Sequence, residues 1–247
     1  MSNLLESIYD IALEAGAAIM ERYHGNIQVE EKADSSPVTE ADLAANTIIV
    51  EQLTRLTPEI PLLTEESAHT PWSERQEWST FWLVDPLDGT KEFLRKNGEF
   101  TVNIALIENG KPVLAVVHAP ALEKTWLGDS DKAWLQTKAG REQIKARLST
   151  VPIVVGSRSH PSPDMADYLS NLGEHKMIEV GSSLKFCMVA EGRAQYYPRL
   201  GPTMMWDTAA GQCIAESAGA KVHQFNGDEL NYHREDLLNP YFIVEVA

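Results

Sequence analysis

The chain has 247 residues, of which 43% are hydrophobic and 23% are charged, and these ordinary values exclude a disordered, collagen-like or low-complexity protein. Its 21 lysines and arginines against 36 aspartates and glutamates leave a formal net charge of −15, which argues against a protein that binds nucleic acid or an anionic membrane through a basic surface. The length allows one large domain or two modest ones, each able to bury a core.

The first half of the chain predicts two helices followed by an antiparallel sheet. Apolar residues recur at helical spacing from Leu4 to Ile19, and a second helical pattern runs from about Thr39 to Leu56. Strand-like runs follow at residues 81–84, 100–107, 113–117, 126–127 and 133–135. Asn109-Gly110 separates the second and third of these runs, and this pair is typical of a tight hairpin turn.

The second half predicts alternating strands and helices. A polar stretch rich in Lys and Arg, residues 138–152, indicates a connector with a soft boundary. Beyond it we expect strands at 153–155, 177–180, 194–197, 221–225 and 242–246, and helices at 163–172, 182–191 and 206–217. Residues 1–140 are thus expected to pack helices on an antiparallel sheet. Residues 150–247 are expected to form an α/β half, joined to the first in one compact body.

Redox and targeting signals point to the cytoplasm. Cys187 and Cys213 are too far apart in sequence for a CxxC motif, and each is expected to be a buried thiol. The first twenty residues lack the basic and apolar regions of a signal peptide. No apolar run reaches the about 18 residues that a membrane-spanning helix needs. We therefore expect a cytoplasmic protein without a transmembrane segment.

The stretch Asp85-Pro86-Leu87-Asp88-Gly89-Thr90 is the most informative part of the sequence, because it directly follows the apolar run 81–84. Two carboxylates three residues apart on a strand-exit loop can converge on one point. Asp, Pro and Gly are also ordinary turn residues, so the same stretch is compatible with a solvated loop. Its meaning depends on which other acids lie near it.

Three further acids lie at the ends of predicted elements. Glu65 follows the apolar run 62–64, and Asp207 and Asp42 each fall in the first turn of a predicted helix. Helix capping alone is an alternative explanation for both aspartates. Gathered in one place, such carboxylates repel one another unless a cation neutralises them. An all-oxygen set without His or Cys favours Mg²⁺ or Mn²⁺ over zinc.

The segments Asp85–Thr90 and Trp206-Asp207-Thr208-Ala209-Ala210-Gly211 resemble the two signature motifs of the inositol monophosphatase superfamily. Members of that superfamily are Mg²⁺-dependent, lithium-sensitive phosphomonoesterases, and the likeness covers nearly the whole chain. Further segments resemble its branch of CysQ-type 3′(2′),5′-bisphosphate nucleotidases, namely 36–39, 89–93, 97–103, 181–187, 197–199 and 201–203. The resemblance implies a layered α+β or α/β sandwich, in which helices and sheets alternate as α-β-α-β-α layers.

The resemblance also implies an activity and a role. The expected reaction removes the 3′-phosphate of adenosine 3′,5′-bisphosphate (PAP) to give AMP and phosphate, and the sulfated nucleotide PAPS is allowed as a further substrate. The implied role is removal of a by-product of sulfate activation. The resemblance further allows peripheral association with the inner membrane, which nothing in the composition supports.

Carried over by position, the metal ligands of the family fall on five residues of this chain. Glu65, Asp85 and the backbone carbonyl of Leu87 are implied to hold one Mg²⁺. Asp85, Asp88 and Asp207 are implied to hold a second, with Asp85 as the bridge between the two ions. The resemblance implies two or three ions in all.

The catalytic roles implied by the resemblance fall on Asp42, Glu65 and Thr90. Asp42 would orient Thr90, whose hydroxyl, with Glu65, would position the attacking water in line. The backbone N–H groups of Gly89 and Thr90 would bind the scissile phosphate. The implied substrate contacts as a whole are Glu65, Leu87, Asp88, Gly89, Thr90, Ser157, His160, Gly181, Ser182, Lys185, Arg199 and Asp207.

Two kinds of alternative stay open. An inositol monophosphatase or sugar bisphosphatase of the same superfamily has the same metal ligands and differs at the contacts to the second phosphate, here His160, Lys185 and Arg199. Each of these can instead be an ordinary surface residue, although Lys185 lies at a helix start that suits an anion. A non-catalytic Mg²⁺-dependent binding module is expected to lack Asp42, Glu65 or Thr90, and this chain keeps all three.

Overall fold

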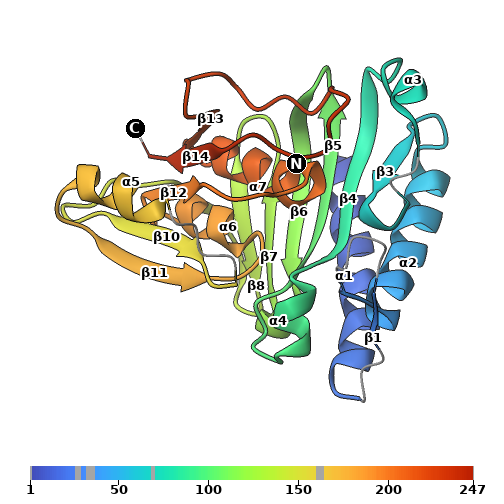
Figure 1. Cartoon of the computed structure of the whole chain (residues 1–247). Coiled ribbons are helices and arrows are strands. Elements are labelled where there is room, and N and C mark those ends of the chain that lie inside the picture. The colour runs from blue at the N-terminus through green and yellow to red at the C-terminus, as the bar shows by residue number, and fades with distance from the viewer. Residues whose placement is uncertain (1, 26–28, 32–36, 68–69, 160–163, 247) are drawn as a thin grey trace.

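Helices and sheets alternate in five layers in the computed structural model of the chain (Figure 1). The model describes residues 2–25, 29–31, 37–67, 70–159 and 164–246. α1 (Asn3–Tyr23) and α2 (Glu40–Leu56) cover one face of a seven-stranded sheet. α6 (Leu184–Ala190) and α7 (Met205–Ser217) separate that sheet from a five-stranded one, and α5 (Met165–Leu172) lies beyond it. The expected α-β-α-β-α layering is confirmed.

The seven-stranded sheet has the strand order β3-β4-β5-β6-β7-β8-β9. Its strands are β3 (Leu62–Thr64), β4 (Thr80–Asp88), β5 (Thr101–Glu108), β6 (Lys111–Ala119), β7 (Lys124–Gly128), β8 (Ala133–Thr137) and β9 (Gly140–Ile144). β3 pairs with β4 in parallel, and the other neighbours are antiparallel as predicted. Asn109 and Gly110, between β5 and β6, have φ angles of 50° and 79°, which the predicted type of hairpin turn requires.

β9 contradicts one expectation, because residues 140–144 form the edge strand of this sheet and do not belong to a connector. In the segment Gly-Arg-Glu-Gln-Ile only Ile144 is buried, so the usual alternation of apolar and polar residues is absent. An edge strand that packs few side chains against a core needs little apolar sequence. The polar sequence therefore did not predict this strand, although the strand is paired along its length with β8.

The five-stranded sheet has the order β11-β10-β12-β14-β13. Its strands are β10 (Ile153–Ser157), β11 (Lys176–Val180), β12 (Tyr196–Arg199), β13 (Lys221–Gln224) and β14 (Phe242–Glu245). β10 runs parallel to β11 and β12, whereas β14 is antiparallel to β12 and β13. The expected alternation of strands and helices is present, although β12 begins two residues later than predicted.

Both faces of β4 are buried, and this explains its continuous apolar run. Trp82 and Val84 pack into the core under α1 and α2, while Phe81 and Leu83 pack into the core around α7. Because side chains alternate between the two faces of a strand, Asp85 falls on the same face as Phe81 and Leu83. The strand thus directs a carboxylate toward the layer that contains α7.

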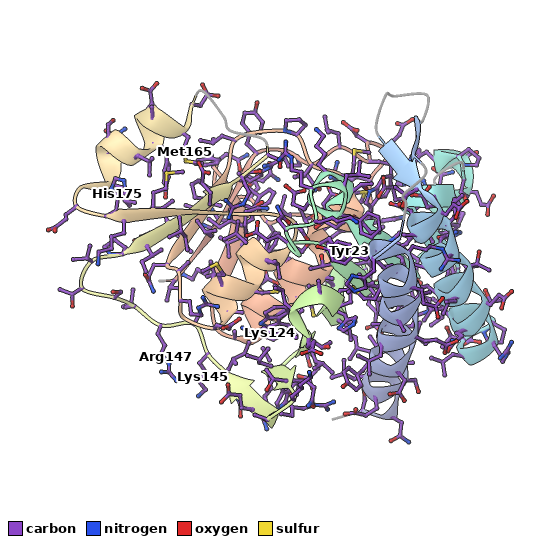
Figure 2. All side chains as sticks on the ribbon, turned by 90° about the horizontal axis from the view of Figure 1, so that it is seen from below. Tyr23, Lys124, Lys145, Arg147, Met165 and His175 are labelled. Atoms are coloured by element: carbon purple, nitrogen blue, oxygen red, sulfur yellow. The ribbon has the colours of Figure 1, made fainter. Side chains whose placement is uncertain are left out.

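Several short elements have no counterpart among the predictions, namely β1 (Val29–Glu31), β2 (Pro37–Thr39), η1 (Glu65–Ser67), α3 (Trp72–Arg75), α4 (Thr90–Leu94) and η2 (Pro120–Leu122). Figure 2 labels Tyr23, which lies at the end of α1. Its ring lies 5.4 Å from that of Phe93 in α4 and 5.0 Å from that of Phe100. This packing fixes the helix that begins at Thr90.

Two sequence expectations can be compared directly with the described residues. Cys187 and Cys213 are both buried and not bonded to each other, as expected. No helix in the described ranges combines the length and the apolar character that crossing a membrane requires.

Candidate active site

Three carboxylates from distant parts of the chain converge on the face of β4 that is turned toward α7. Asp85 lies within β4, Asp88 ends this strand, and Asp207 lies in the first turn of α7. One oxygen from each lies within 4.8 Å of the others. Glu65 follows β3, and because Thr64 pairs with Val84, Glu65 emerges beside Asp85. All four acids line one cavity.

An irregularity in β4 allows Asp85 and Asp88 to approach the same point. The register with β5 shifts between these two residues, so Pro86 and Leu87 form a bulge. Proline has no N–H to give to the ladder, and the Leu87 N–H donates to Asp85 Oδ1 at 3.0 Å. Leu87 is fully buried in the core under α1 and α2, which holds the bulge in place.

The cluster brings several negative charges together in a buried place. Burial, and then the nearby charges of Glu65, Asp88 and Asp207, raise the pKa of Asp85 well above its ordinary value. Burial and the charge of Asp88 do the same to the pKa of Asp207. Such a site needs bound cations or protons at neutral pH, and an all-oxygen donor set suits a hard divalent ion. The residues present therefore fit a metal centre.

Hydrogen bonds from the second half of the chain orient Asp88. Its Oδ2 accepts from the backbone N–H of Ser183 at 2.6 Å and from Asn103 Nδ2 at 3.5 Å. The Ser183 hydroxyl donates to the backbone carbonyl of Asp207 at 2.7 Å and accepts from Asn103 Nδ2 at 2.9 Å. Ser183 and Asn103 thus join the two ends of the cluster, and the sequence analysis did not identify either of them.

Asp42 is both a helix cap and a neighbour of Thr90. Its Oδ2 accepts from the backbone N–H of Thr39 at 2.8 Å and from the hydroxyl of Thr39 at 2.6 Å, forming a capping box at the start of α2. Its Oδ1 accepts from the Thr90 hydroxyl at 3.3 Å. Burial raises the pKa of Asp42, partly offset by the hydrogen bonds from Thr39. The capping interpretation of Asp42 is correct, and it leaves one oxygen for Thr90.

Gly89 permits the sharp turn from β4 into α4. Its φ of +95° lies in the region that disfavours side chains, and a Cβ there would lie only 3.2 Å from the Glu99 backbone oxygen and 3.3 Å from Ser182 Cβ. The turn brings Gly89 and Thr90 to the wall of the cavity beside Asp88.

The cavity has a volume of about 640 Å³, and the cations Lys91, Lys185 and Arg199 lie in its wall. Lys185 is buried, and its Nζ donates to the Ser182 carbonyl at 2.5 Å and lies 5.5 Å from the centre of the Tyr197 ring. Burial lowers the pKa of Lys185 to about 8, against the opposing effect of Asp88. Arg199 is also buried; its Nη2 donates to the Pro202 carbonyl at 2.6 Å. Its Nε has no hydrogen-bond partner within the described residues.

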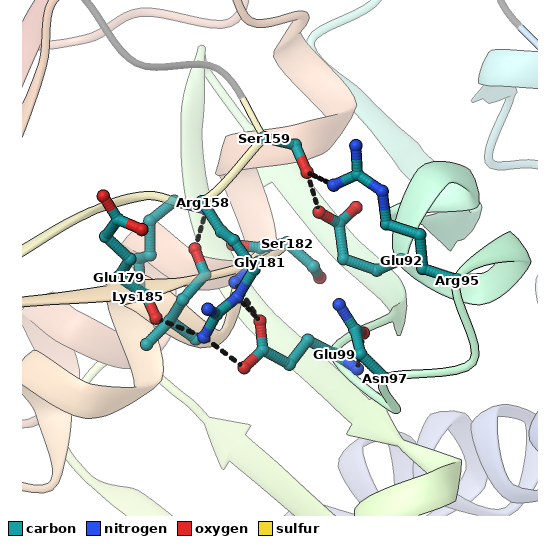
Figure 3. Close-up of polar contacts among 11 residues, drawn as sticks. Glu92, Arg95, Asn97, Glu99, Arg158, Ser159, Glu179, Gly181, Ser182 and Lys185 are labelled. Carbon is teal, nitrogen blue, oxygen red and sulfur yellow. Dashed lines mark hydrogen bonds and ion pairs between the residues drawn. The ribbon is translucent and has the colours of Figure 1, made fainter.

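A second polar network, drawn in Figure 3, holds the turn at Gly181 and Ser182. Glu99 accepts from Arg158 through both carboxylate oxygens, at 2.8 and 2.9 Å, and from the Gly181 N–H at 2.8 Å. A Cβ at Gly181 would approach Glu99 O to 2.9 Å, so only glycine fits without a shift. Ser182 has a φ of 54°. The network ties the exit of β11 to the loop before β5.

The same network continues to α4. Ser159 donates to a carboxylate oxygen of Glu92, and Arg95 Nη1 donates to Ser159 Oγ at 2.8 Å (Figure 3). The loop after β10 is thereby joined to the helix that begins at Thr90. None of these residues was singled out from the sequence, because their partners lie 64 and 67 positions away.

The structure brings together most of the substrate contacts that the resemblance implied. The implied contacts that line the cavity are Glu65, Leu87, Asp88, Gly89, Thr90, Ser157, Gly181, Ser182, Lys185, Arg199 and Asp207. His160 lies outside the described residues, so its place is not known. Ser182 was expected inside a helix, whereas the helix begins at Leu184 and Ser182 belongs to the preceding turn.

Comparisons with known proteins find relatives along almost the whole chain. The inositol monophosphatase family model matches residues 1–245. The chain is 54% identical to the 3′(2′),5′-bisphosphate nucleotidase CysQ of Salmonella typhimurium, an alignment of 246 residues that covers 98% of this chain and 100% of the relative. It is 52% identical to the CysQ nucleotidase of Escherichia coli strain K12 with the same coverage.

Solved structures show the same fold. CysQ from Bacteroides thetaiotaomicron superposes with a TM-score of 0.88 at 40% identity, covering 98% of this chain and 96% of that one. An IMPase from Thermotoga maritima superposes with a TM-score of 0.82 at 25% identity, covering 99% and 92%.

Proposed function

The chain belongs to the inositol monophosphatase family, and from this premise we propose that it is a 3′(2′),5′-bisphosphate nucleotidase that hydrolyses the 3′-phosphate of PAP to AMP and phosphate. The observation that carries this proposal is identity of 52–54% over almost the full length with relatives named for that activity. The cell would use the reaction to remove a by-product of sulfate activation, and PAPS is a second proposed substrate.

The proposed cofactor is Mg²⁺, as two or three ions. Glu65, Asp85 and the Leu87 carbonyl would hold one ion, and Asp85, Asp88 and Asp207 another. The close carboxylates, with the raised pKa values of Asp85 and Asp207, support this assignment. When bound, such ions lower the pKa of water and neutralise charge on the phosphate.

The protein's own contribution to the attack lies in Thr90, Asp42 and Glu65. The Thr90 hydroxyl gives its hydrogen to Asp42 Oδ1, so its oxygen lone pairs are free to accept a hydrogen from the attacking water. Asp42 cannot rotate away, because its other oxygen is held by Thr39. Glu65 would take part in orienting the same water. Orientation of this kind reduces the entropy that the attack must lose.

The remaining proposed contacts hold the two phosphates. The N–H groups of Gly89 and Thr90 would bind the scissile group. Lys185 and Arg199 would bind the other phosphate, and the unpartnered Nε of Arg199 in the cavity wall supports this role. Inorganic and organic phosphates are common partners of such charge-assisted donors. Ser157, Gly181 and Ser182 would complete the polar wall beside them.

The deciding experiment compares phosphate release from PAP and from inositol 1-phosphate, each with Mg²⁺ and with EDTA. A Mg²⁺-dependent rate that strongly favours PAP supports the proposal. Preference for inositol 1-phosphate would keep the metal centre and reject the nucleotide substrate. No release from either compound would support a non-catalytic binding protein.

Variants separate the metal centre from the fold. Asp88→Asn and Asp207→Asn are expected to fold normally and to lose turnover. Asp131→Asn, which removes an exposed acid from a turn, is the matched control for loss of charge. Near-normal rates for both site variants at saturating Mg²⁺ would contradict the assignment of the ligands.

A further inference from the structure

Part of the cavity wall is apolar and comes from a segment near the C-terminus. Leu237 and Leu238 line the cavity together with Met204, which immediately precedes α7. Leu238 is 43% exposed although it is a large apolar side chain. Met204 and Leu238 form an antiparallel bridge, so the two side chains belong to one continuous rim. The proposed metal ligands and the cations Lys185 and Arg199 line the same cavity.

Hydrogen bonds from Arg234 and the buried Asn239 hold this rim in place. Arg234 donates to the Leu238 carbonyl at 2.7 Å and to Asn239 Oδ1 at 2.7 Å. Asn239 is buried; its Nδ2 donates to the Met204 carbonyl at 2.7 Å and its N–H to the Thr203 carbonyl at 2.8 Å. The side chain of Leu238 is therefore held at the mouth of the cavity.

A second arginine secures the start of the same segment from outside. Arg75, in α3, is buried and donates to the carbonyls of Arg234 and Glu235 at 3.2 and 2.9 Å. The backbone N–H of Leu238 donates to Asp236 Oδ1 at 2.9 Å. Direct hydrogen bonds thus connect Arg75 in α3 to residues 234 and 235, and Arg234 to the backbone of Leu238. These bonds hold the backbone that carries the exposed leucine.

The distribution of chemistry in the cavity suggests what this rim contacts. A bisphosphate nucleotide has two phosphates, for which the acids with their ions and the pair Lys185 and Arg199 are available. Its remaining large part is an aromatic base with apolar faces. Binding sites of this kind combine a few polar groups with an apolar wall that covers the flat part of the ligand. A flexible thioether and a branched aliphatic side chain both pack well on an aromatic face.

We propose that Leu238, together with Met204, forms the surface on which the base of the substrate packs, and that Leu238 is a specificity-determining residue for nucleotides over phosphates without a base. The inference rests on the proposed function and deepens it. Leu238 takes no part in the chemistry, so it is expected to affect the binding of the nucleotide and not the attack on the phosphate.

The test uses the full chain and two substrates that differ only in the base: PAP, and 1,4-anhydro-D-ribitol 3,5-bisphosphate, in which hydrogen replaces adenine on the same ribose. Leu238→Ala is expected to lower kcat/KM for PAP about tenfold, mostly through KM, and to leave kcat/KM for the abasic compound unchanged. Leu238→Met keeps an apolar contact and is expected to stay close to the wild type. Leu56→Ala is the matched control, because Leu56 is 39% exposed and does not line this cavity.

Each outcome decides the question. A loss confined to PAP supports the inference. An equal loss on both compounds, or no loss on PAP, overturns it and leaves the proposed function intact. If the wild type hydrolyses the abasic compound as well as PAP, the base makes no useful contact, and the inference is again overturned. If the wild type releases no phosphate from PAP, the proposed function itself fails, and this inference fails with it.

Discussion

Removal of one charge from the carboxylate cluster is expected to stabilise the metal-free protein and to abolish its stabilisation by Mg²⁺. Asp85→Asn is the suitable change, because Asp85 is buried and lies between Glu65, Asp88 and Asp207. Asparagine keeps an oxygen that can accept the Leu87 N–H, now at 3.0 Å from Asp85 Oδ1, so the bulge in β4 is retained. The variant therefore tests charge with little change in shape.

The expected size of the effect follows from the spacing of the acids. One oxygen of each of Asp85, Asp88 and Asp207 lies within 4.8 Å of the others, and two unit charges at that distance repel by about 3 kcal/mol at an effective dielectric constant of about 20. Partial protonation of the cluster reduces this penalty, so a gain of about 1–3 kcal/mol is expected without metal. For a chain of this size each kcal/mol corresponds to about 2–4 °C in Tm.

Mg²⁺ should reverse the order of stability. An ion at about 100 times its Kd stabilises the wild type by about 2.7 kcal/mol, and the variant should lose most of this gain. Thermal unfolding in EDTA and in Mg²⁺ measures both effects, with Asp131→Asn as the control for an exposed acid. A variant that is less stable than the wild type in EDTA and keeps its full Mg²⁺ shift would refute the reasoning.

Three further outcomes are expected. Thr90→Ala should lower kcat for PAP by about 10²-fold and change KM little, because the Thr90 hydroxyl orients the attacking water and does not bind the substrate. Steady-state kinetics that show a change in KM alone would contradict this expectation. Since burial lowers the pKa of Lys185 to about 8, kcat/KM for PAP should fall as pH rises through that value, whereas Lys185→Met should give a lower but flat profile. Burial also lowers the pKa of His118 from 6.5 to about 4. Between these two pH values the unfolded chain binds a proton at His118 and the folded chain does not, so the folded state loses stability as the pH falls. Urea unfolding should show a loss of about 3 kcal/mol in the free energy of unfolding between pH 6.5 and pH 4. His118→Asn should be less stable at pH 7 and should lack most of that dependence.

The residues of the site that could be predicted are those that stand close together in short stretches of sequence. Asp85, Asp88, Gly89 and Thr90 stand together in one strand-exit turn, and Asp207 opens a helix with a recognisable pattern. The direction of Asp85 also follows from local periodicity, once the apolar run before it is understood as a strand buried on both faces. Short-range rules are sufficient for these residues.

The supporting hydrogen bonds could not be predicted in this way. Ser183 contacts Asp88 across 95 positions and Asn103 across 80, and Glu99 contacts Arg158 across 59. Serine, asparagine, glutamate and arginine are common in any polar segment, so the neighbouring sequence does not mark these four residues as part of a site. Their roles arise only when the turn before α6 packs against the start of β5. The strand β9 was not predicted for a related reason: its pairing with β8 holds it in the sheet, and its own residues lack a strand-like pattern.

Helix capping and participation in the site were alternative explanations for Asp42 and Asp207, and the structure shows that a capping carboxylate can keep its other oxygen for a second contact. In each case one oxygen accepts from the backbone before the helix: Asp42 from Thr39, and Asp207 from Met204 at 2.8 Å. The cap contributes about 0.5–2 kcal/mol and fixes the side-chain rotamer. It therefore offsets part of the cost of burying a charge and leaves the second oxygen in a defined direction. For this reason the first turn of a helix is a favourable place for a carboxylate that must be both buried and oriented. An acidic residue whose position is explained by helix capping therefore stays a candidate for a functional site.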